Sequence, residues 1–332
     1  MAKTPVFPLA TGGTTPPVYP VGSTAHAFDV NGFIPDIWSG KLIEKFYDST
    51  VLGAISNTDY EGEIKSYGDT VKIRSKPTVT IKDYKISGLL ELERPEGSVQ
   101  DLLIDKGKYF NCILDDVMEV QSDLNALSMW SEDASEQMKI VIDTEVLLNL
   151  LGTANASNRG ATAGRISGDV NLGVTSTPLT VVARSPGAAE VEILDVLLRL
   201  GQVLDEQNIP ESNRWAVMPA WAATMIKQSE LRQVYVSGDQ ISILRNGRLG
   251  MIDRFTLYVS NLLPAGVAAG LQAGEWAIFA GHPHGLTFAS QYTNVQTLQS
   301  EMTFGRILRG LQVFGYKVLD GVAIAEAIVT KP

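Results

Sequence analysis

The residues best suited to chemistry in this sequence are three histidines, one cysteine and several neighbouring carboxylates. His282 and His284 lie two apart in GHPHG, a spacing that a metal site can use. However, Pro283 between them favours a turn, no third ligand is near in sequence, and His26 is isolated. Cys112 stands among apolar residues without a local nucleophile motif, and a single cysteine excludes an intrachain disulfide. We therefore expect a turn at the histidine pair and a buried thiol at Cys112.

The carboxylates fall into two groups, Asp115, Asp116, Glu119 and Asp123 in one and Glu61 and Glu63 in the other. The first group could bind a hard cation, but acidic residues are also favoured where a helix begins. Nothing in the sequence fixes the distance between the members of the second group. The phosphate-binding, dinucleotide-binding and hydrolase-elbow motifs are absent from the sequence. We therefore predict no catalytic, metal or cofactor site and do not expect an enzyme.

The composition is that of a folded protein whose surface is acidic. The 332 residues are 45% hydrophobic and 19% charged, with a net charge of −10. That length allows one large or two modest domains. A protein that grips nucleic acid needs a basic face, and no cluster of Lys and Arg is present. No secretory signal is visible, and no apolar run approaches the roughly 20 residues of a membrane span, so no membrane partner is expected.

A long helix is predicted from about Val117 to Leu151. This stretch lacks Pro and Gly, and Gly152 ends it. Apolar residues recur three and four apart and predict one buried face, while most charged residues, Asp143 among them, are predicted to lie off it. The predicted face comprises Val117, Val120, Leu124, Leu127, Ala134, Met138, Val141 and Leu148. Such a helix would be about 50 Å long, so we interpret it as a spine that other elements pack across.

Two segments before the spine are hard to bury within one subunit. Residues 1–35 are rich in proline yet carry scattered aromatic residues, which favours an arm that orders against a neighbour over a flexible tail. A helix is expected after Pro35. Residues 62–114 indicate a long β-hairpin, with strands at 70–74 and 102–114, a bulge or bend at Gly107, and a charged insert at 76–98. The insert is predicted to contact a neighbouring copy, the alternative being a solvated hairpin tip.

The rest of the chain alternates between strands and helices. Strands are predicted near 179–183, 214–219, 241–244, 255–259 and 276–279, and helices at 190–208 and 220–229. Residues 284–302 could hold one strand pair and 310–318 another, and the apolar end at 321–329 is predicted to be buried. Strands on both sides of this α/β region suggest that it is a second domain inserted into the domain of the spine.

Three stretches carry a family resemblance. They are IPDIWSGKLIEKFYDSTVLGAISNTDYEGEIKSYGDTVKIRSKP from Ile34 to Pro77, RWAVMPAWAATMIKQSEL from Arg214 to Leu231, and LQVFGYKVLDGVAIAEA from Leu311 to Ala327. The sequence resembles the major capsid proteins of tailed bacteriophages, which have the HK97-like fold. The resemblance implies an α+β fold with a long spine helix, an extended β-hairpin loop, a peripheral domain and an inserted axial domain. It assigns 1–55 to the arm and its helix, 56–114 to the loop, 115–152 with 283–332 to the peripheral domain, and 153–282 to the axial domain.

The implied function is self-assembly into an icosahedral shell of hexamers and pentamers around double-stranded DNA that is held without sequence-specific binding. The virion is the implied location, and the host bacterial cytoplasm is the implied place of assembly. The implied partners are a portal, decoration or cement proteins and, because the arm is short, a separate scaffolding protein if any. The predicted inter-subunit contacts are Phe7, Tyr19 and Phe28 of the arm and Lys82, Tyr84, Lys85, Glu91, Glu93 and Arg94 of the loop. A lysine–asparagine cross-link known in one family member has no motif-matched acceptor here.

Two alternatives remain open from the sequence. An encapsulin-like compartment protein would share the fold but enclose an enzyme cargo. A soluble α/β enzyme would instead be a compact monomer with a deep polar pocket.

Overall fold

A computed structural model of the chain describes residues 47–48, 50–59, 70–74, 76–84, 86, 89, 92–116, 126–229, 250–301 and 303–332. Several predictions lie outside these residues. They concern the arm with Phe7, Tyr19, Phe28 and His26, the helix after Pro35, the carboxylates Glu61, Glu63, Glu119 and Asp123, the spine before residue 126, the loop residues Lys85 and Glu91, and the strand at 241–244.

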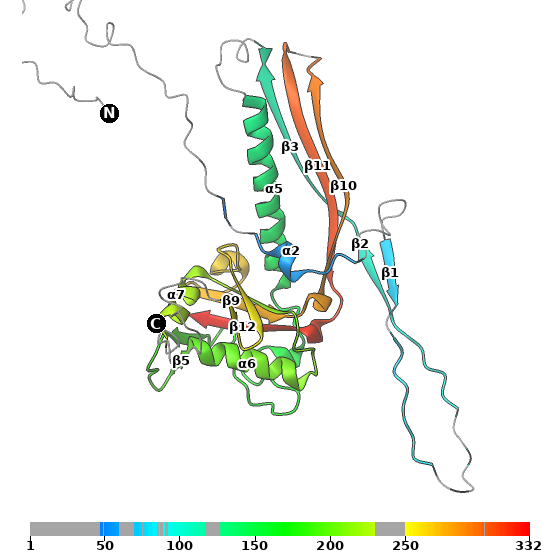
Figure 1. Cartoon of the computed structure of the whole chain (residues 1–332), viewed down its shortest axis with the longest axis vertical. Coiled ribbons are helices and arrows are strands. Elements are labelled where there is room, and N and C mark those ends of the chain that lie inside the picture. The colour runs from blue at the N-terminus through cyan, green and yellow to red at the C-terminus, as the bar shows by residue number, and fades with distance from the viewer. Residues whose placement is uncertain are drawn as a thin grey trace, which may run out of the picture. The chain divides into compact units, whose positions relative to one another are not determined.

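The described chain forms three sheets and several helices (Figure 1). In chain order the first elements are α2 (Leu52–Ile55), β1 (Thr70–Arg74), β2 (Val99–Leu103), β3 (Lys106–Asp115) and the spine helix α5 (Ala126–Leu150). The 3₁₀ turn η1 (Ala156–Asn158), β4 (Leu179–Val182), β5 (Glu190–Glu192), α6 (Ile193–Glu206), β6 (Arg214–Met218) and α7 (Ala220–Gln228) follow. The last elements are β7 (Met251–Ile252), β8 (Phe255–Val259), η3 (Val267–Ala269), β9 (Glu275–Gly281), η4 (Pro283–Gly285), β10 (Leu286–Gln299), β11 (Gly305–Val318), η5 (Gly321–Ala323) and β12 (Ile324–Thr330).

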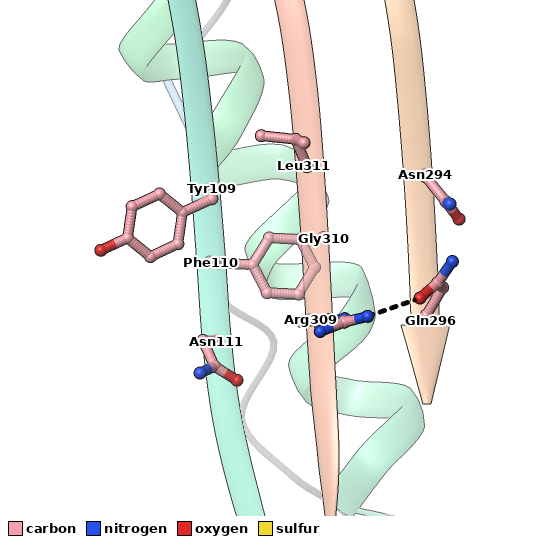
Figure 2. Close-up of a pocket in the computed structure, with 8 residues that line it drawn as sticks. All are labelled: Tyr109, Phe110, Asn111, Asn294, Gln296, Arg309, Gly310 and Leu311. Atoms are coloured by element: carbon pink, nitrogen blue, oxygen red, sulfur yellow. Dashed lines mark hydrogen bonds between the residues drawn. The ribbon is translucent and has the colours of Figure 1, made fainter. Parts of the chain in front are cut away.

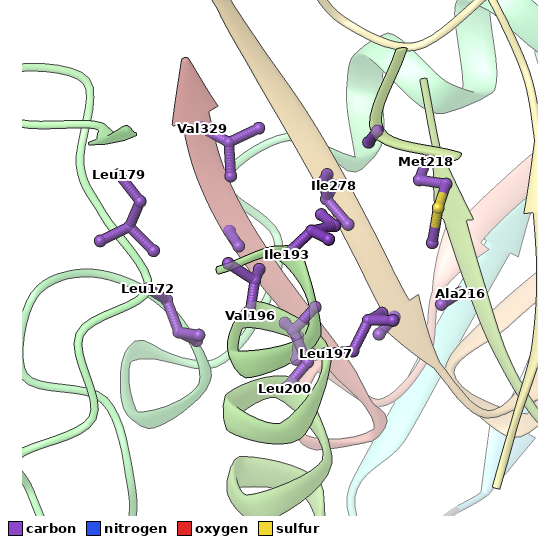
Figure 3. Close-up of a cluster of buried hydrophobic side chains, with 14 of the residues drawn as sticks. Leu172, Leu179, Ile193, Val196, Leu197, Leu200, Ala216, Met218, Ile278 and Val329 are labelled. Carbon is purple, nitrogen blue, oxygen red and sulfur yellow. The ribbon is translucent and has the colours of Figure 1, made fainter. Parts of the chain in front are cut away.

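A seven-stranded mixed sheet, in the order β5-β4-β12-β9-β6-β8-β7, is buried on both faces. Because side chains alternate across a strand, β6 sends Ala216 and Met218 into one core and Trp215 and Val217 into the other. The first core packs against α6, whose apolar residues recur three and four apart (Figure 3). The second core receives the C-terminal half of α5 and the start of β10. A sheet covered on both faces explains why WAVM, the part of β6 after Arg214, is apolar without alternation.

A three-stranded antiparallel sheet in the order β10-β11-β3 packs against α5 (Figure 1). β10 and β11 form one long hairpin that pairs from Leu286↔Val318 to Gln299↔Arg306. The separate strand pairs predicted for this region are wrong, because each strand runs for 14 residues without a turn. Both strands lie on the same sheet as β3.

The predicted hairpin at 62–114 proves to be two structures. β2 pairs with β1, whereas β3 pairs with β11 in the other sheet, so the strand predicted at 102–114 breaks at residues 104–105. Gly107 is neither a bulge nor a bend, since it pairs in regular register with Val313. The C-terminal segment also divides: β12 joins the seven-stranded sheet between β4 and β9, whereas β10 and β11 lie in the sheet beside the spine.

The spine helix ends as predicted, but its buried face differs. Gly152 follows the helix with φ of 77°, a conformation that glycine adopts without strain. The buried side chains in its C-terminal half are Ile142, Asp143, Val146, Leu147 and Leu150. Val141 and Leu148, predicted to be inside, are 46% and 41% exposed, and Leu127 is only partly buried. Asp143, predicted outside, is buried where it accepts a hydrogen bond from the Val51 backbone N–H just before α2.

Candidate assembly surfaces

The loop between β1 and β2, residues 75–98, starts from a firmly held base. Val71 and Ile73 of β1 pack with Leu102, Ile104 and Ala289 in a small buried cluster. Two long-range hydrogen bonds fix β2: the Gln100 side-chain amide donates to the Leu319 carbonyl at 2.9 Å, and the Lys317 ammonium donates to the Asp101 carbonyl at 2.9 Å. The base of the loop is therefore anchored to the C-terminal end of β11.

The described residues of the loop itself expose large apolar side chains. Ile81 and Ile86 are 89% and 88% exposed, and Leu89 and Leu92 are 99% and 100% exposed. Isolated exposed apolar residues are ordinary, but a run of them in one loop marks an interaction site. Sequence reasoning missed these residues because the surrounding lysines and glutamates dominated the pattern. The alternation of Val79 and Ile81 was the available signal.

The four described loop residues that we predicted as contacts are all exposed: Lys82, Tyr84, Glu93 and Arg94. The structure brings one of them into contact across the loop, since the Thr80 hydroxyl donates to the Glu93 carboxylate at 3.1 Å. This bond joins the two limbs of the loop 13 residues apart. The other three present their side chains at the surface, and their contacts with a neighbour remain a prediction.

The three-stranded sheet is covered by α5 on one face and open on the other. Along β3, side chains alternate between partly buried and exposed, and Tyr109 on the open face is 79% exposed. A groove of about 430 Å³ crosses this sheet (Figure 2), lined by Tyr109, Phe110, Asn111, Asn294, Gln296, Arg309, Gly310 and Leu311. Within it the Arg309 guanidinium donates to the Gln296 side-chain oxygen at 3.0 Å. The open face thus combines apolar side chains with hydrogen-bonding groups.

Comparison with known proteins identifies the family to which the chain belongs. A family model described as "Phage capsid protein" matches residues 103–327, more than half of the chain. The chain belongs to the phage capsid protein family. A solved structure from Mycobacterium phage Che8 is 25% identical and has a TM-score of 0.69, covering 90% of this chain and 97% of that one. No curated protein matches.

Two further solved structures support the same fold for the capsid protein. The capsid of cyanophage P-SCSP1u has a TM-score of 0.69 at 14% identity, covering 91% of this chain and 94% of that chain. The mature capsid of bacteriophage PhiM1 has a TM-score of 0.63 at 16% identity, covering 90% and 92%. These two structures bear on the fold alone. The family match over residues 103–327 and the Che8 structure make the chain a shell-forming major capsid protein with the α+β, HK97-like fold, and its place is the virion. Its family and structural neighbours are structural proteins that associate with themselves.

The covered face of the three-stranded sheet is joined to the spine by charge. Glu145 of α5 forms ion pairs with Lys108 at 2.6 Å and with Lys106 at 3.4 Å. Burial alone would raise the pKa of Glu145, but the two lysines outweigh it, so that pKa lies below its usual value. The Lys106 ammonium also lies 5.1 Å from the centre of the Tyr316 ring. Glu145, which interrupts the apolar stripe in the sequence, thus fixes the sheet to the helix of the capsid protein.

Of the residues first considered for chemistry, the histidine pair has a structural role. His282 accepts a hydrogen bond at Nδ1 from the His284 backbone N–H at 3.2 Å, within the turn predicted for GHPHG. Cys112 is only partly buried, so the expectation of a buried thiol was too strong. Within the described residues, no three His, Cys, Asp or Glu side chains gather closely enough to hold a metal ion. Likewise, no described helix has the length and apolarity to cross a membrane.

Proposed function

We propose that copies of this capsid protein close into an icosahedral shell of hexamers and pentamers, and that the loop at 76–98 of each copy lies on a neighbouring copy. The observation that carries the proposal is the set of four apolar loop side chains that are 88–100% exposed. Burying an isoleucine or leucine side chain contributes about 1.5–3 kcal/mol. No described part of the same chain covers these residues. Covering them with a neighbouring copy therefore supplies several kcal/mol of favourable free energy for the contact.

The open face of the three-stranded sheet is the surface that suits this loop. Tyr109, Ile113 and Leu311 are exposed there, and Arg309 and Asn294 supply polar contacts for the loop's charged residues. Each such contact is modest. Closure of a symmetric shell nevertheless multiplies them, because every copy that donates a loop also receives one.

The content of the shell is proposed to be double-stranded DNA held without sequence-specific contacts. A net charge of −10 keeps unassembled copies apart and gives the wall no general grip on phosphates. The same proposal includes a portal, decoration or cement proteins and a separate scaffolding protein as partners, with assembly in the host bacterial cytoplasm. Nuclease-protected DNA in purified particles, rather than an enzyme cargo, distinguishes this function from that of an encapsulin-like compartment.

The loop is tested by replacing Ile81, Leu89 and Leu92 together with serine. We expect a folded subunit that forms no shells by negative-stain electron microscopy, because the contact surface is lost while the buried base of the loop is intact. Deleting residues 78–97 should have the same effect. The matched control is Ile166→Ser, which changes a side chain that is 75% exposed in another loop and should leave assembly unchanged. Normal shells from the triple variant would refute the role of the loop.

A further inference from the structure

Two further surfaces lie at opposite ends of β11, and of their residues only Lys76 belongs to the loop at 76–98 that the proposed function uses. The first, here called the distal tip, consists of the β10–β11 turn and the adjacent end of β3. Asp115 pairs with Gly305 in the sheet, and the Asp116 backbone N–H donates to the Phe304 carbonyl at 3.2 Å. Asp115, Asp116 and Glu301 are exposed, and Phe304 is 89% exposed. The distal tip is therefore an acidic projection that carries one large aromatic side chain.

The described residues of the distal tip are joined by hydrogen bonds of their own. The Ser300 backbone N–H donates to the Gly305 carbonyl at 2.9 Å, and the Thr303 backbone N–H donates to the Ser300 hydroxyl oxygen at 3.2 Å. Arg306, the second residue of β11, carries one positive charge beside the three carboxylates of the tip. The tip therefore keeps a net negative charge. These hydrogen bonds do not involve the Phe304 side chain, which is left exposed for a partner.

The second surface, here called the basal groove, lies where the loop base meets the turns before β10 and after β11. It has a volume of about 500 Å³ and is lined by Ile73, Arg74, Lys76, Gln100, His284, Leu319 and Asp320. Ile73 and Leu319 supply apolar lining, whereas Arg74, Lys76 and His284 are exposed. Asp320 is the acidic member, and one of its oxygens already accepts the Val322 backbone N–H at 2.9 Å. The groove is thus a locally basic hollow on an acidic protein.

One copy cannot join its own tip to its own groove. β11 runs from Gly305 at the tip to Val318 beside the groove. At about 3.4 Å per residue, this antiparallel strand holds the two surfaces roughly 45 Å apart. The partner that fits both surfaces is therefore a second copy of this chain, in a head-to-tail contact that extends into a closed ring or a continuing row.

We propose that the distal tip of one copy docks in the basal groove of a second copy, with Phe304 against Ile73 and Leu319 and the tip carboxylates facing Arg74 and Lys76. Because copies of net charge −10 repel one another, contact is favoured where a basic hollow meets an acidic projection. This inference rests on the proposed function, since it adds a second contact between copies of the same shell.

Other exposed carboxylates suit the groove less well. Glu136 on α5 already pairs with Lys139 at 2.6 Å, and Glu93 in the loop accepts a hydrogen bond from Thr80. Neither lies beside a projecting aromatic side chain that is comparable to Phe304. Of these three candidates, the distal tip matches the groove in both charge and apolar character.

Reciprocal charge reversal tests the contact. Lys76→Glu alone and Glu301→Lys alone are each expected to lower the yield of shells at least fivefold, measured by sedimentation and electron microscopy. Combining them in one chain should restore the yield to within twofold of the original, because opposite charges face each other again. Arg165→Glu, an equal charge change at an exposed position elsewhere, should leave the yield unchanged. A combined variant that is no better than either single one would overturn the proposal.

Disulfide trapping provides a second measurement that does not depend on shell yield. In a Cys112→Ser background, chains carrying Phe304→Cys are co-assembled with chains carrying Leu319→Cys and then oxidised. We expect cross-linked dimers in the mixture at several times the level seen with either chain alone. Shells that form with no excess of dimers in the mixture would contradict the tip-to-groove contact.

The two proposals fail in distinguishable ways. If the proposed function is wrong, the unaltered chain forms no shells and the cysteine pair gives no cross-link. If only the tip-to-groove contact is wrong, the unaltered chain assembles and the loop variant blocks assembly, but charge reversal shows no rescue and the mixed cysteine chains show no excess of dimers.

Discussion

Replacing Asp143 with asparagine should change how the stability of the subunit depends on pH. Asp143 lies on α5, is 1% exposed, and accepts a hydrogen bond from the Val51 backbone N–H at 2.7 Å. Burial raises the pKa of this carboxyl from 3.8 to about 6, although the Val51 and Leu52 amides favour the charged form. The spine thus holds the start of α2 through a carboxylate that is costly to keep ionised.

The size of the effect follows from that shift. A pKa raised from 3.8 to about 6 corresponds to roughly 3 kcal/mol between the two protonation states. The folded state binds the proton more tightly than the unfolded state, so stability falls as pH rises from about 4 to about 6 and is level above that. The substituted amide would keep an oxygen that can accept the Val51 N–H, but it cannot ionise. The difference in unfolding free energy, Asp143→Asn minus the original, should therefore increase by about 2–3 kcal/mol between pH 4 and pH 8.

Urea unfolding of unassembled subunits, followed by tryptophan fluorescence at several pH values, measures this difference. Comparing both chains at the same pH cancels the titration of every other group. The extra N–H of the amide adds an offset, but that offset is the same at each pH. Asp169→Asn, at an exposed position, controls for the loss of one charge. Two stability curves that run parallel across this range would refute the assignment of a raised pKa to Asp143.

Three further substitutions test the packing around the spine and the sheet. Leu147→Ala should lower the unfolding free energy by about 2–5 kcal/mol, whereas Leu148→Ala, on the exposed face, should lower it by less than about 1 kcal/mol, both measured in urea. Gly315→Ala places a methyl group 2.2 Å from a backbone oxygen at the end of β2, so a loss of about 1–3 kcal/mol is expected in thermal unfolding, while Gly53→Ala meets nothing within 4 Å. Glu145→Gln removes two ion pairs to β3 and should cost about 1 kcal/mol or less at neutral pH. That contribution comes from a lowered pKa, so it is present above the usual glutamate pKa and disappears in acid, which unfolding at pH 7 and pH 3 would show.

The sequence was most informative where the type and position of a helix or strand follow from the pattern of its own side chains. β6 was predicted with one residue too many, because a strand buried on both faces is largely apolar. The helix predicted at 190–208 contains α6, whose apolar residues repeat every three to four positions, but its first three residues form the strand β5 instead. The prediction failed where a distant partner decides the structure. The break between β2 and β3 follows from pairing with β11, about 200 residues later in the chain, which no local pattern encodes.

The buried face of the spine was predicted wrongly for a related reason. Leu127, Ala134, Val141 and Leu148 form a seven-residue repeat, which predicts one narrow buried stripe. In the structure, α5 contacts the three-stranded sheet on one side and, in its C-terminal half, α2 and the seven-stranded sheet on another. Burial therefore follows these two layers and reaches Asp143. Likewise, the sequence drew attention to the charged residues of the loop, whose contacts with a neighbour stay a prediction, and not to its exposed isoleucines and leucines.

The direction of the loop is set by packing against β11 and not by a flexible linker. At Gly315 the backbone of residues 103–104 approaches so closely that an added Cβ would lie 2.2 Å from the Leu103 oxygen. At Gly310 the Phe110 ring occupies the space of a side chain. The bend between β2 and β3 therefore packs directly against β11. The same strand carries the distal tip at one end and adjoins the basal groove at the other. A change at Gly315 should thus alter the geometry of assembled particles as well as the stability of the subunit.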